Sequence, residues 1–253
     1  SNSYLKRIKW KHKNKKAGFS GTLDPFACGC LIVAFGQYPK LFRFLKKTPK
    51  TYRTTIWLDV LSNSLDIENI EHQIKNKELN EEDIKKEIDG LVGSLDYLPP
   101  KYSAKKIDGK RAYDLARAGE DFEMKRVTSQ VYDVKFINYN HPFISFDITV
   151  SEGSYIRSMA QILLERLGAI GTLSYLKRLN EGEFFFDDEK ELNPLEYIDL
   201  PANNYTGTKE WFDLGKKLDI NYFEYHLLHY FFVIKTENFF VSLLDLTLVY
   251  QNL

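Results

Sequence analysis

One carboxylate stands apart in the stretch GFSGTLDPFACG, residues 18–29, because no other charged side chain lies within it. Asp24 precedes a proline, and no lysine or arginine occurs between Lys16 and Lys40. An aspartate at such a position is often a turn residue that hydrogen-bonds its own backbone. The three glycines of the stretch also let the backbone turn tightly and let a ligand approach closely. Asp24 is therefore either a turn former or a carboxylate that acts on a bound substrate.

A second group of interest is SEGSYIRS, residues 151–158, where a tyrosine and an arginine flank Ile156. The plain interpretation places Tyr155 in the core and Arg157 in solvent. The functional interpretation aims the arginine at a carboxylate or a phosphate, which its planar guanidinium binds well. If Arg157 paired with Asp24, it would hold that carboxylate ionised and oriented. The sequence alone leaves this pairing open.

Metal and cofactor sites find little support in the sequence. The five histidines are scattered, and only His226 and His229 share a close spacing, with no cysteine or third ligand near them. The chain has no phosphate-binding loop, no dinucleotide fingerprint and no Gly-x-Ser-x-Gly hydrolase turn. Cys28 and Cys30 are too close for an unstrained disulfide, so we expect small buried thiols in a reducing compartment. We expect no metal and no cofactor.

The charged residues are segregated by sign although the net charge is zero, with 35 basic and 35 acidic side chains. Three runs are rich in lysine and arginine and nearly free of acids: residues 1–17, 40–53 and 101–111. The acids gather at 66–96 and 181–199. Each basic run alone is explained by a solvated surface. Together the runs fit one basic face that binds RNA phosphates, with aromatic residues available for stacking.

The hydrophobic pattern predicts an α+β protein whose strands follow one another in hairpins. Asn80 caps a helix with acidic residues in its first turn, where the helix dipole favours them. Gly168 ends the helix expected over residues 154–167. Alternation in VYDVKF and FISFDITV, joined through His141 and Pro142, predicts a hairpin. The glycines and the proline of residues 18–30 predict a loop. The expected helices cover residues 4–13, 40–47, 80–92 and 154–167, and the expected strands cover 31–35, 51–60, 131–136, 143–150 and 183–186.

A domain boundary is expected near residues 190–200, because the patterning weakens after Pro194. The larger domain would cover residues 1–190, and a small C-terminal segment would cover 195–253. HYFFVIK and ENFFVSLLDL predict two further strands in that segment. No long apolar run marks a signal peptide or a membrane span, so we expect a cytoplasmic monomer that does not contact membranes.

These stretches together resemble the TruB family of tRNA pseudouridine synthases. GFSGTLDPFACG is similar to the family pattern Gly-His-x-Gly-x-Leu-Asp-Pro-x-Ala-x-Gly, and KTYRTTIWLD resembles its Lys-x-Tyr strand. PPKYSAKKIDGKRAY resembles its Pro-Pro, Tyr-Ser-Ala-x-Lys and Gly-Lys-x-x-Tyr segment, SYIRS its Tyr-Ile-Arg-Ser helix, and LSYLKRL its Leu-Arg-Arg element. The matches occur in the family's order over about residues 5–185, and an ordered set is far more specific than any single motif.

The resemblance implies a fold and a set of roles. The implied fold is α+β: a mixed, largely antiparallel sheet core of pseudouridine-synthase type, with flanking helices and a small C-terminal appendage that contains β-structure. Asp24 matches the catalytic aspartate, which acts either as a nucleophile on the nucleoside or as a base toward the ribose. Tyr52 matches the tyrosine that stacks on the flipped base, and Arg157 matches the arginine that pairs with the aspartate. Tyr155 and Leu176 match positions in the wall of the substrate pocket.

The implied substrate is the uridine at position 55 in the T loop of tRNA, which such enzymes detach from its ribose, rotate and rejoin through carbon 5. The uridine must flip out of the loop to reach a buried carboxylate. Stacking on Tyr52 would offset part of the unstacking cost, at about 1–3 kcal/mol per base. The implied RNA-contacting residues are Lys40 and Lys50 of the second basic run and Ser103, Lys105, Lys106 and Lys110 of the third.

Three features depart from the family pattern. Phe19 stands where the family has histidine, and its ring would still occupy the space of the displaced base by stacking. The Lys-Pro-x-Gly segment that precedes the first helix in the family is absent, so we expect that residues are missing before Ser1. The segment after residue 195 lacks the pattern of a complete PUA RNA-binding domain, and its two expected strands fit a reduced version.

Two other functions compete with pseudouridine synthesis. A non-catalytic tRNA-binding or tRNA-folding module would use Asp24 only as a turn former, and the complete set of Asp24, Tyr52 and Arg157 argues against it. A carboxylate-dependent nucleoside hydrolase would release free uracil, but the sequence lacks the paired carboxylates or the metal site that such chemistry recruits. The most decisive observation is the distance between the Asp24 carboxylate and the Arg157 guanidinium.

Overall fold

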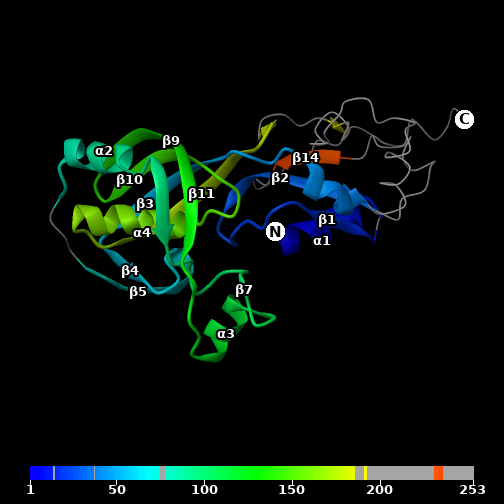
Figure 1. Ribbon diagram of the computed structural model, residues 1–253, viewed down its shortest axis with the longest axis horizontal. Helices are drawn as coiled ribbons and strands as arrows, with labels where there is room; N and C mark the ends of the chain where they lie inside the picture. The colour runs from blue at the N-terminus through cyan, green and yellow to red at the C-terminus, as the bar shows by residue number, and fades with distance from the viewer. Residues whose placement is uncertain (14, 37, 75–77, 186–190, 193–230, 236–253) are drawn as a thin grey trace, which may run out of the picture.

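One mixed sheet runs through the part of the chain that the computed structural model describes, which is residues 1–13, 15–36, 38–74, 78–185, 191–192 and 231–235 (Figure 1). Its strands, in spatial order, are β13 (Glu191–Leu192), β14 (Phe231–Lys235), β2 (Cys28–Phe35), β11 (Gly171–Glu181), β3 (Lys50–Leu58), β10 (Phe143–Val150), β9 (Val127–Asn140) and β6 (Gly93–Tyr97). Two short strands extend it, because β1 (Ala17–Phe19) pairs with β2 and β12 (Phe184–Phe185) pairs with β11. Every described pairing in this sheet is antiparallel except that of β2 with β11, which confirms the mixed, largely antiparallel α+β class.

β11 lies in the middle of the sheet, between β2 and β3, although the sequence pattern predicted no strand there. Register shifts between Leu173 and Tyr175 and between Arg178 and Asn180 interrupt its alternation of buried and exposed positions, which hides the period of two. The parallel contact with β2 is very close at Gly29, where a Cβ atom would lie 2.1 Å from the carbonyl oxygen of Arg178. With φ at +110°, only glycine fits this position.

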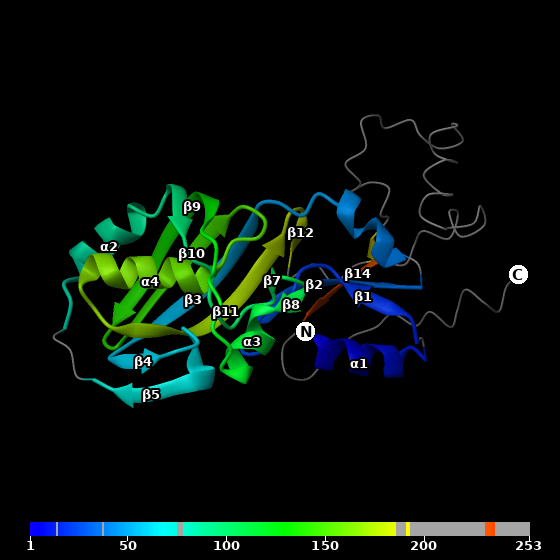
Figure 2. The same ribbon diagram turned by 60° about the horizontal axis from the view of Figure 1, so that its bottom comes forward.

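Two helices cover one face of the sheet, as Figure 2 shows. α4 (Ile156–Leu167) packs against β11, α2 (Glu81–Asp89) packs against β9, and the two helices contact each other. The cap of α2 is as predicted, since the side chain of Asn80 accepts hydrogen bonds from the amides of Glu82 and Asp83. Gly168 ends α4 in the left-handed conformation, which was also predicted from its position.

The N-terminal part of the chain adds α1 (Asn2–Lys11) and the 3₁₀ helix η1 (Tyr38–Phe44) beside β1 and β2. α1 buries Leu5 and Ile8 and carries basic residues on its exposed side. The expectation of a loop over 18–30 was too long. Strand β1 pairs with the far end of β2, and β2 already begins at Cys28, because backbone pairing continues through the glycines.

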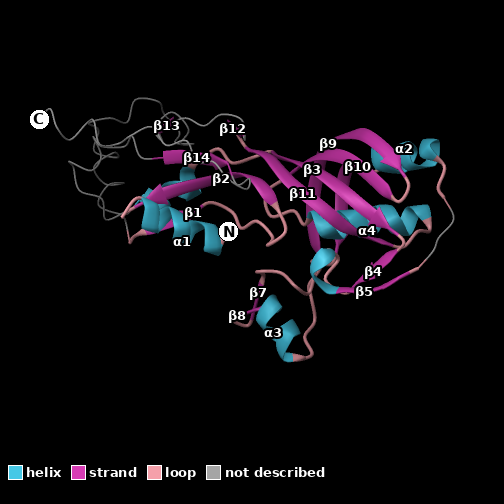
Figure 3. Ribbon diagram, turned by 180° about the vertical axis from the view of Figure 1, so that it is seen from behind, coloured by secondary structure: helices cyan, strands magenta, loops and turns pink. Residues whose placement is uncertain are grey.

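Two small substructures lie outside the main sheet. The hairpin of β7 (Lys106–Ile107) and β8 (Lys110–Arg111) and the helix α3 (Ala112–Ala118) form a lobe that projects from the sheet (Figure 3). β4 (Val60–Ser62) and β5 (Ile70–Gln73) form a separate pair, with the 3₁₀ helix η2 (Ile67–Asn69) between them. The predicted strand 51–60 therefore ends at Leu58, because Asp59 turns the chain with a φ of +66°.

The predicted hairpin near His141 is confirmed as β9 and β10, with strands longer than expected. Of the two strands predicted near the C-terminus, Phe231–Lys235 is β14, whose backbone pairs with β2. The other predicted strand and the expected boundary at 190–200 lie largely outside the described residues. Among the helices of the described chain, none has both the length and the apolar character needed to cross a membrane.

Candidate active site

Arg157, in the first turn of α4, joins distant segments of the chain at one point. Its Nη2 atom donates to Asp24 Oδ1 at 2.9 Å, as the functional interpretation of the sequence required. Its Nη1 atom donates to Asp66 Oδ2 at 3.0 Å. The backbone carbonyls of Ser64 and Tyr102 accept further bonds from the same guanidinium, each at 2.9 Å. The Arg157 side chain is only 5% exposed, so a rigid set of partners fixes its orientation.

Asp24 combines the two roles that its sequence left open. Its backbone carbonyl accepts a hydrogen bond from the amide of Ala27 at 3.0 Å, which is the contact of a turn. Its carboxylate instead reaches Arg157 across the cleft and keeps 29% of its surface exposed. The turn therefore presents the carboxylate to a bound molecule while one oxygen is held by the guanidinium.

Both burial and Arg157 act on the pKa of the Asp24 carboxyl. Burial raises the pKa of the Asp24 carboxyl above its ordinary value, and the negative charge of Asp66 acts in the same direction. The charge and hydrogen bond of Arg157 lower that pKa but do not fully offset the burial. The pair is thus correctly predicted in geometry, whereas its effect on ionisation is outweighed by desolvation.

Asp66 is a site residue that sequence reasoning missed. Its side chain is 2% exposed, accepts a hydrogen bond from Ser64 Oγ at 2.6 Å and caps η2 by accepting from the amide of Glu68 at 3.0 Å. In the sequence, Asp66 is one of the acids that gather at residues 66–96. The signal in the sequence was the hydroxyl-rich stretch SNSLD, because serines flanking an aspartate often build local caps.

Four of the five predicted substrate residues line a cavity of about 270 Å³ next to Asp24, the exception being Phe19. Tyr52 comes from β3, Leu176 from β11, and Tyr155 and Arg157 from the start of α4, and all of them line this cavity together with Asp24. Tyr52 and Leu176 are nearly buried, at 9% and 4% exposed. Burial raises the pKa of both tyrosine hydroxyls, so they stay protonated hydrogen-bond donors at neutral pH.

Phe19, which the family resemblance placed near the target base, lies elsewhere in the described structure. It belongs to β1, is paired with Val33 of β2, and packs against the hydrophobic core. It is not among the residues that line the cavity around Asp24. Its predicted contact with the substrate stays a prediction.

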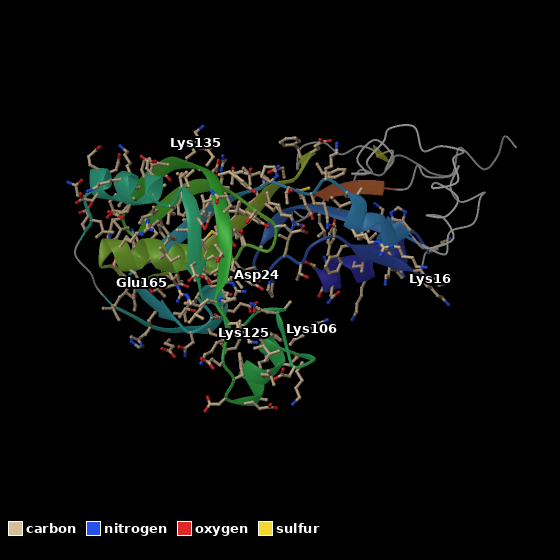
Figure 4. The ribbon with its side chains drawn as sticks, in the orientation of Figure 1. Lys16, Asp24, Lys106, Lys125, Lys135 and Glu165 are labelled. Carbon is tan, nitrogen blue, oxygen red and sulfur yellow. The ribbon has the colours of Figure 1, made fainter. Side chains whose placement is uncertain are left out.

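A wider cleft of about 830 Å³ adjoins the small cavity and shares Asp24 and Arg157 with it. Arg7 of α1 lines this cleft, and so do Arg111 and Tyr113 of the projecting lobe. Figure 4 shows Asp24 at the centre of the molecule, with Lys106 and Lys125 on the same side as the lobe. Asp24 therefore lies where a broad cleft meets a smaller cavity.

The residues predicted to contact RNA fall into two groups. Lys40, Lys106 and Lys110 are exposed and Lys105 is half-buried, which suits contact with phosphates. Ser103 and Lys50 are instead 5% exposed. Ser103 lines both cavities, and Lys50 lines the smaller one, where its ammonium lies 3.2 Å from Glu181.

Within the described ranges, no group of three or more histidine, cysteine, aspartate or glutamate side chains is arranged to hold a metal ion. Cys30 is fully buried, and burial raises the pKa of its thiol to about 12. Cys28 is half-buried and lines the wider cleft, and its thiol lies 3.7 Å from the hydroxyl of Tyr175.

Comparison with known proteins finds a matching family model and similar sequences over most of this chain. Residues 9–156 match the family model described as TruB family pseudouridylate synthase (N terminal domain). The chain is 49% identical over 240 residues to tRNA pseudouridine synthase B of Sulfurovum sp. (strain NBC37-1), which covers 95% of this chain and 86% of that protein. It is 50% identical over 241 residues to tRNA pseudouridine synthase B of Campylobacter jejuni (strain 81-176), covering 95% of this chain and 88% of that protein.

Solved structures share the fold at lower sequence identity. A Cbf5 chain in a Cbf5-Nop10-Gar1 complex has a TM-score of 0.55 and 24% identity over 73% of this chain and 46% of the Cbf5 chain. An archaeal box H/ACA Nop10-Cbf5 complex gives a TM-score of 0.53 and 20% identity, covering 90% of this chain and 57% of that chain. This chain thus spans about half the length of the solved chains it matches, and the likeness concerns the fold.

Proposed function

The chain belongs to the TruB family of pseudouridylate synthases, and on this premise we propose that it converts uridine to pseudouridine in the T loop of tRNA, with Asp24 as the catalytic residue. The observation that carries this proposal is the 2.9 Å contact between Arg157 and Asp24 at the mouth of a cavity lined by Tyr52, Tyr155 and Leu176. A turn former without a catalytic role has no need of a buried arginine from another element.

The reaction rearranges a single nucleotide. The bond between N1 of uracil and C1′ of the ribose breaks, the base rotates, and a bond forms between C5 and C1′. The hydrogen on C5 is lost and N1 gains one, so atoms and electrons balance without a co-substrate. The site therefore has to hold the flipped base, act on the ribose and keep the detached base in place.

The two cavities divide this work. The small cavity takes the flipped uracil, where the ring of Tyr52 offers a stacking surface and Leu176 an apolar wall. The wider cleft takes the T arm, whose phosphates meet Arg7 on one rim and Arg111 on the other. Flipping moves the nucleotide from the wide cleft into the small cavity, past Asp24.

Asp24 acts on the nucleotide in its ionised form. It attacks the sugar as a nucleophile or removes a proton from the ribose as a base, and both routes need a free carboxylate oxygen. Arg157 binds Oδ1, which fixes the plane of the carboxylate and leaves Oδ2 for the substrate. Partial burial removes water from this oxygen and makes it a stronger base than an exposed aspartate.

Release of tritium from a tRNA transcript labelled at C5 of uridine tests the proposal, because only carbon–carbon bond formation at C5 expels that hydrogen. We expect tritium release from the T-loop uridine by the wild-type chain. Asp24→Asn should lower the rate about 1,000-fold or more while tRNA binding is retained. Retained activity in this variant would refute the role of Asp24.

Other products of the same assay separate the competing functions. Free uracil in the supernatant would identify a nucleoside hydrolase. Tight tRNA binding by the wild-type chain without tritium release would identify a binding module. Asp108→Asn, on the exposed tip of the β7–β8 hairpin, is the matched control and should leave the rate unchanged.

A further inference from the structure

A second buried ionic cluster, made by Lys50, Arg178 and Glu181, adjoins the catalytic aspartate but takes no part in the proposed chemistry. The three residues are 5%, 1% and 0% exposed. Lys50 Nζ lies 3.2 Å from Glu181 Oε1, and Arg178 Nη2 lies 3.2 Å from Glu181 Oε2. Lys50 and Arg178 line the small cavity together with Asp24 and Tyr52.

Glu181 is the buried counter-charge for both cations of this cluster. Lys50 has another acidic neighbour, Glu152, but that contact is longer, at 3.9 Å, and the Glu152 side chain is 56% exposed. An exposed carboxylate is screened by water and compensates a buried ammonium poorly. Burying a charge is costly unless it is paired and hydrogen-bonded. The position of Glu181 therefore determines the positions of the Lys50 ammonium and the Arg178 guanidinium.

One wall of the site rests directly on this cluster. Ser20 Oγ donates to Glu181 Oε1 at 2.6 Å, and the carbonyl oxygen of Gly21 accepts from Arg178 Nη2 at 3.5 Å. A Cβ atom on Gly21 would lie 3.2 to 3.3 Å from the charged ends of Arg178, Glu181 and Lys50. Ser20 and Gly21, which precede Asp24 in the loop, therefore pack against the three charged groups.

The opposite wall is held by the same arginine. Arg178 stands across from Tyr52 in the register of β11 and β3, and its positive charge lowers the pKa of the tyrosine hydroxyl against the larger effect of burial. Its Nε atom also donates to the carbonyl oxygen of Cys30 at 2.8 Å, which ties the cluster to β2. One guanidinium, oriented by Glu181, thus touches the loop of Asp24, the strand of Tyr52 and the strand that leaves the loop.

We propose that Glu181 is a positioning residue that, through Arg178 and Ser20, fixes the Asp24 loop and the ring of Tyr52 relative to each other. The inference rests on the proposed function for its catalytic meaning, because the base stacked on Tyr52 and the carboxylate of Asp24 must meet at one ribose. Reaction requires near-attack separations of about 3–3.5 Å, and a displacement of about 1 Å costs about 100-fold in rate.

Glu181→Gln tests the proposal, because it keeps the shape and a hydrogen-bond acceptor but removes the charge. We expect the single-turnover rate at saturating tRNA to fall about 10- to 100-fold, with the dissociation constant for tRNA unchanged within about twofold. Glu183→Gln, an exposed carboxylate just beyond the end of β11, is the matched control and should behave as wild type. A wild-type rate in Glu181→Gln would overturn the proposal.

A double-mutant cycle separates positioning from general destabilisation. If Glu181 acts through the place of Tyr52, the rate losses of Glu181→Gln and Tyr52→Leu should be less than additive, because the second change removes what the first had already displaced. Additive losses would show that Glu181 affects the rate without acting through Tyr52, and would overturn the proposal.

Hydrogen exchange supplies a readout that does not depend on activity. Amides in a peptide covering residues 18–29 should exchange faster in Glu181→Gln than in the wild type or in Glu183→Gln, whether or not the protein makes pseudouridine. If Glu181→Gln fails to fold, Ser20→Ala removes only the 2.6 Å bond and should give the same local increase. Unchanged exchange in this peptide would refute the positioning role, whereas a wild-type chain without tritium release would refute only the proposed function.

Discussion

Arg157 binds two carboxylates with the two ends of one guanidinium, Asp24 at 2.9 Å and Asp66 at 3.0 Å. The two carboxylates are not equivalent. Asp66 is almost completely buried and is held by Ser64 and a backbone amide, whereas Asp24 faces the cavity. Asp66 therefore anchors the arginine, and the arginine in turn orients the carboxylate that we propose acts on the substrate.

Asp66→Asn should lower the rate of pseudouridine formation although Asp66 does not line the small cavity. The change leaves Arg157 paired with Asp24 but removes the charge that holds the far end of the guanidinium. We expect a rate loss of about 10- to 100-fold and a loss of unfolding free energy of about 1–3 kcal/mol. Tritium release and urea unfolding measure the two quantities. Glu71→Gln, an exposed carboxylate in β5, is the control, and an unaltered rate in Asp66→Asn would contradict the anchoring role.

The rate should rise with pH through a midpoint above the ordinary pKa of an aspartate, which is near 3.8. The sign follows because the proposed reaction needs Asp24 ionised and burial raises the pKa of its carboxyl. Single-turnover rates at saturating tRNA across the acidic range measure this midpoint. Binding of tRNA to Asp24→Asn over the same range controls for effects on the RNA. A midpoint at or below 3.8 would contradict the raised pKa.

The same pKa makes a prediction for stability. A carboxyl whose pKa is raised on folding favours the folded state most below its unfolded pKa, and this contribution is lost as pH rises through the folded pKa. Asp24→Asn removes the ionised form, while Arg157 keeps Asp66 as its partner. At pH 7.5 the variant should therefore be at least as stable as the wild type. The difference between the two proteins should narrow as pH falls.

Urea unfolding at neutral and acidic pH checks this expectation, with Asp108→Asn as the exposed control. A clearly less stable Asp24→Asn at pH 7.5 would show that the ion pair with Arg157 outweighs the cost of burial. The opposite result would mean that the catalytic carboxylate is kept at the expense of stability, as is common in active sites.

The two cysteines should react very differently with a maleimide at pH 8. Cys30 is buried and its pKa of about 12 leaves almost no thiolate, whereas Cys28 is half-buried at the wall of the wider cleft. Mass spectrometry of the native protein should show labelling at Cys28 and none at Cys30. Urea-unfolded protein should be labelled at both. Bound T-arm RNA should slow the labelling of Cys28, and equal rates with and without RNA would contradict its place in the RNA cleft.

Local signals in the sequence predicted the elements whose stability is local. The Asn80 cap, the Gly168 terminus and the β9–β10 hairpin follow from residue preferences and short-range alternation, and the structure confirms them. The family motifs also predicted which residues share the cavity, because each motif contributes residues to the same site from a different part of the chain. Phe19 is not among the residues that line this cavity, and its contact with the substrate stays a prediction.

The features that the sequence did not reveal depend on contacts between distant residues. The register shifts of β11 are set by its neighbours β2 and β3 rather than by its own pattern. The sequence around Asp66 is that of a solvated acid, and its burial depends on the pairing with Arg157 of α4, which is far away in the sequence. Glu181 and Lys50 are residue types that usually lie at the surface. Both are buried here, and each compensates the charge of the other.

The central place of β11 also determines how the protein can be made. β11 pairs on one side with β2 and on the other with β3, and its partner contact between Lys50 and Glu181 joins residues 131 positions apart. During synthesis, Asp24 and Tyr52 therefore leave the ribosome long before β11, whose residues pack between their segments. Pairings of such long range form slowly, and the walls of the cavity around Asp24 are complete only when β11 has joined β2 and β3.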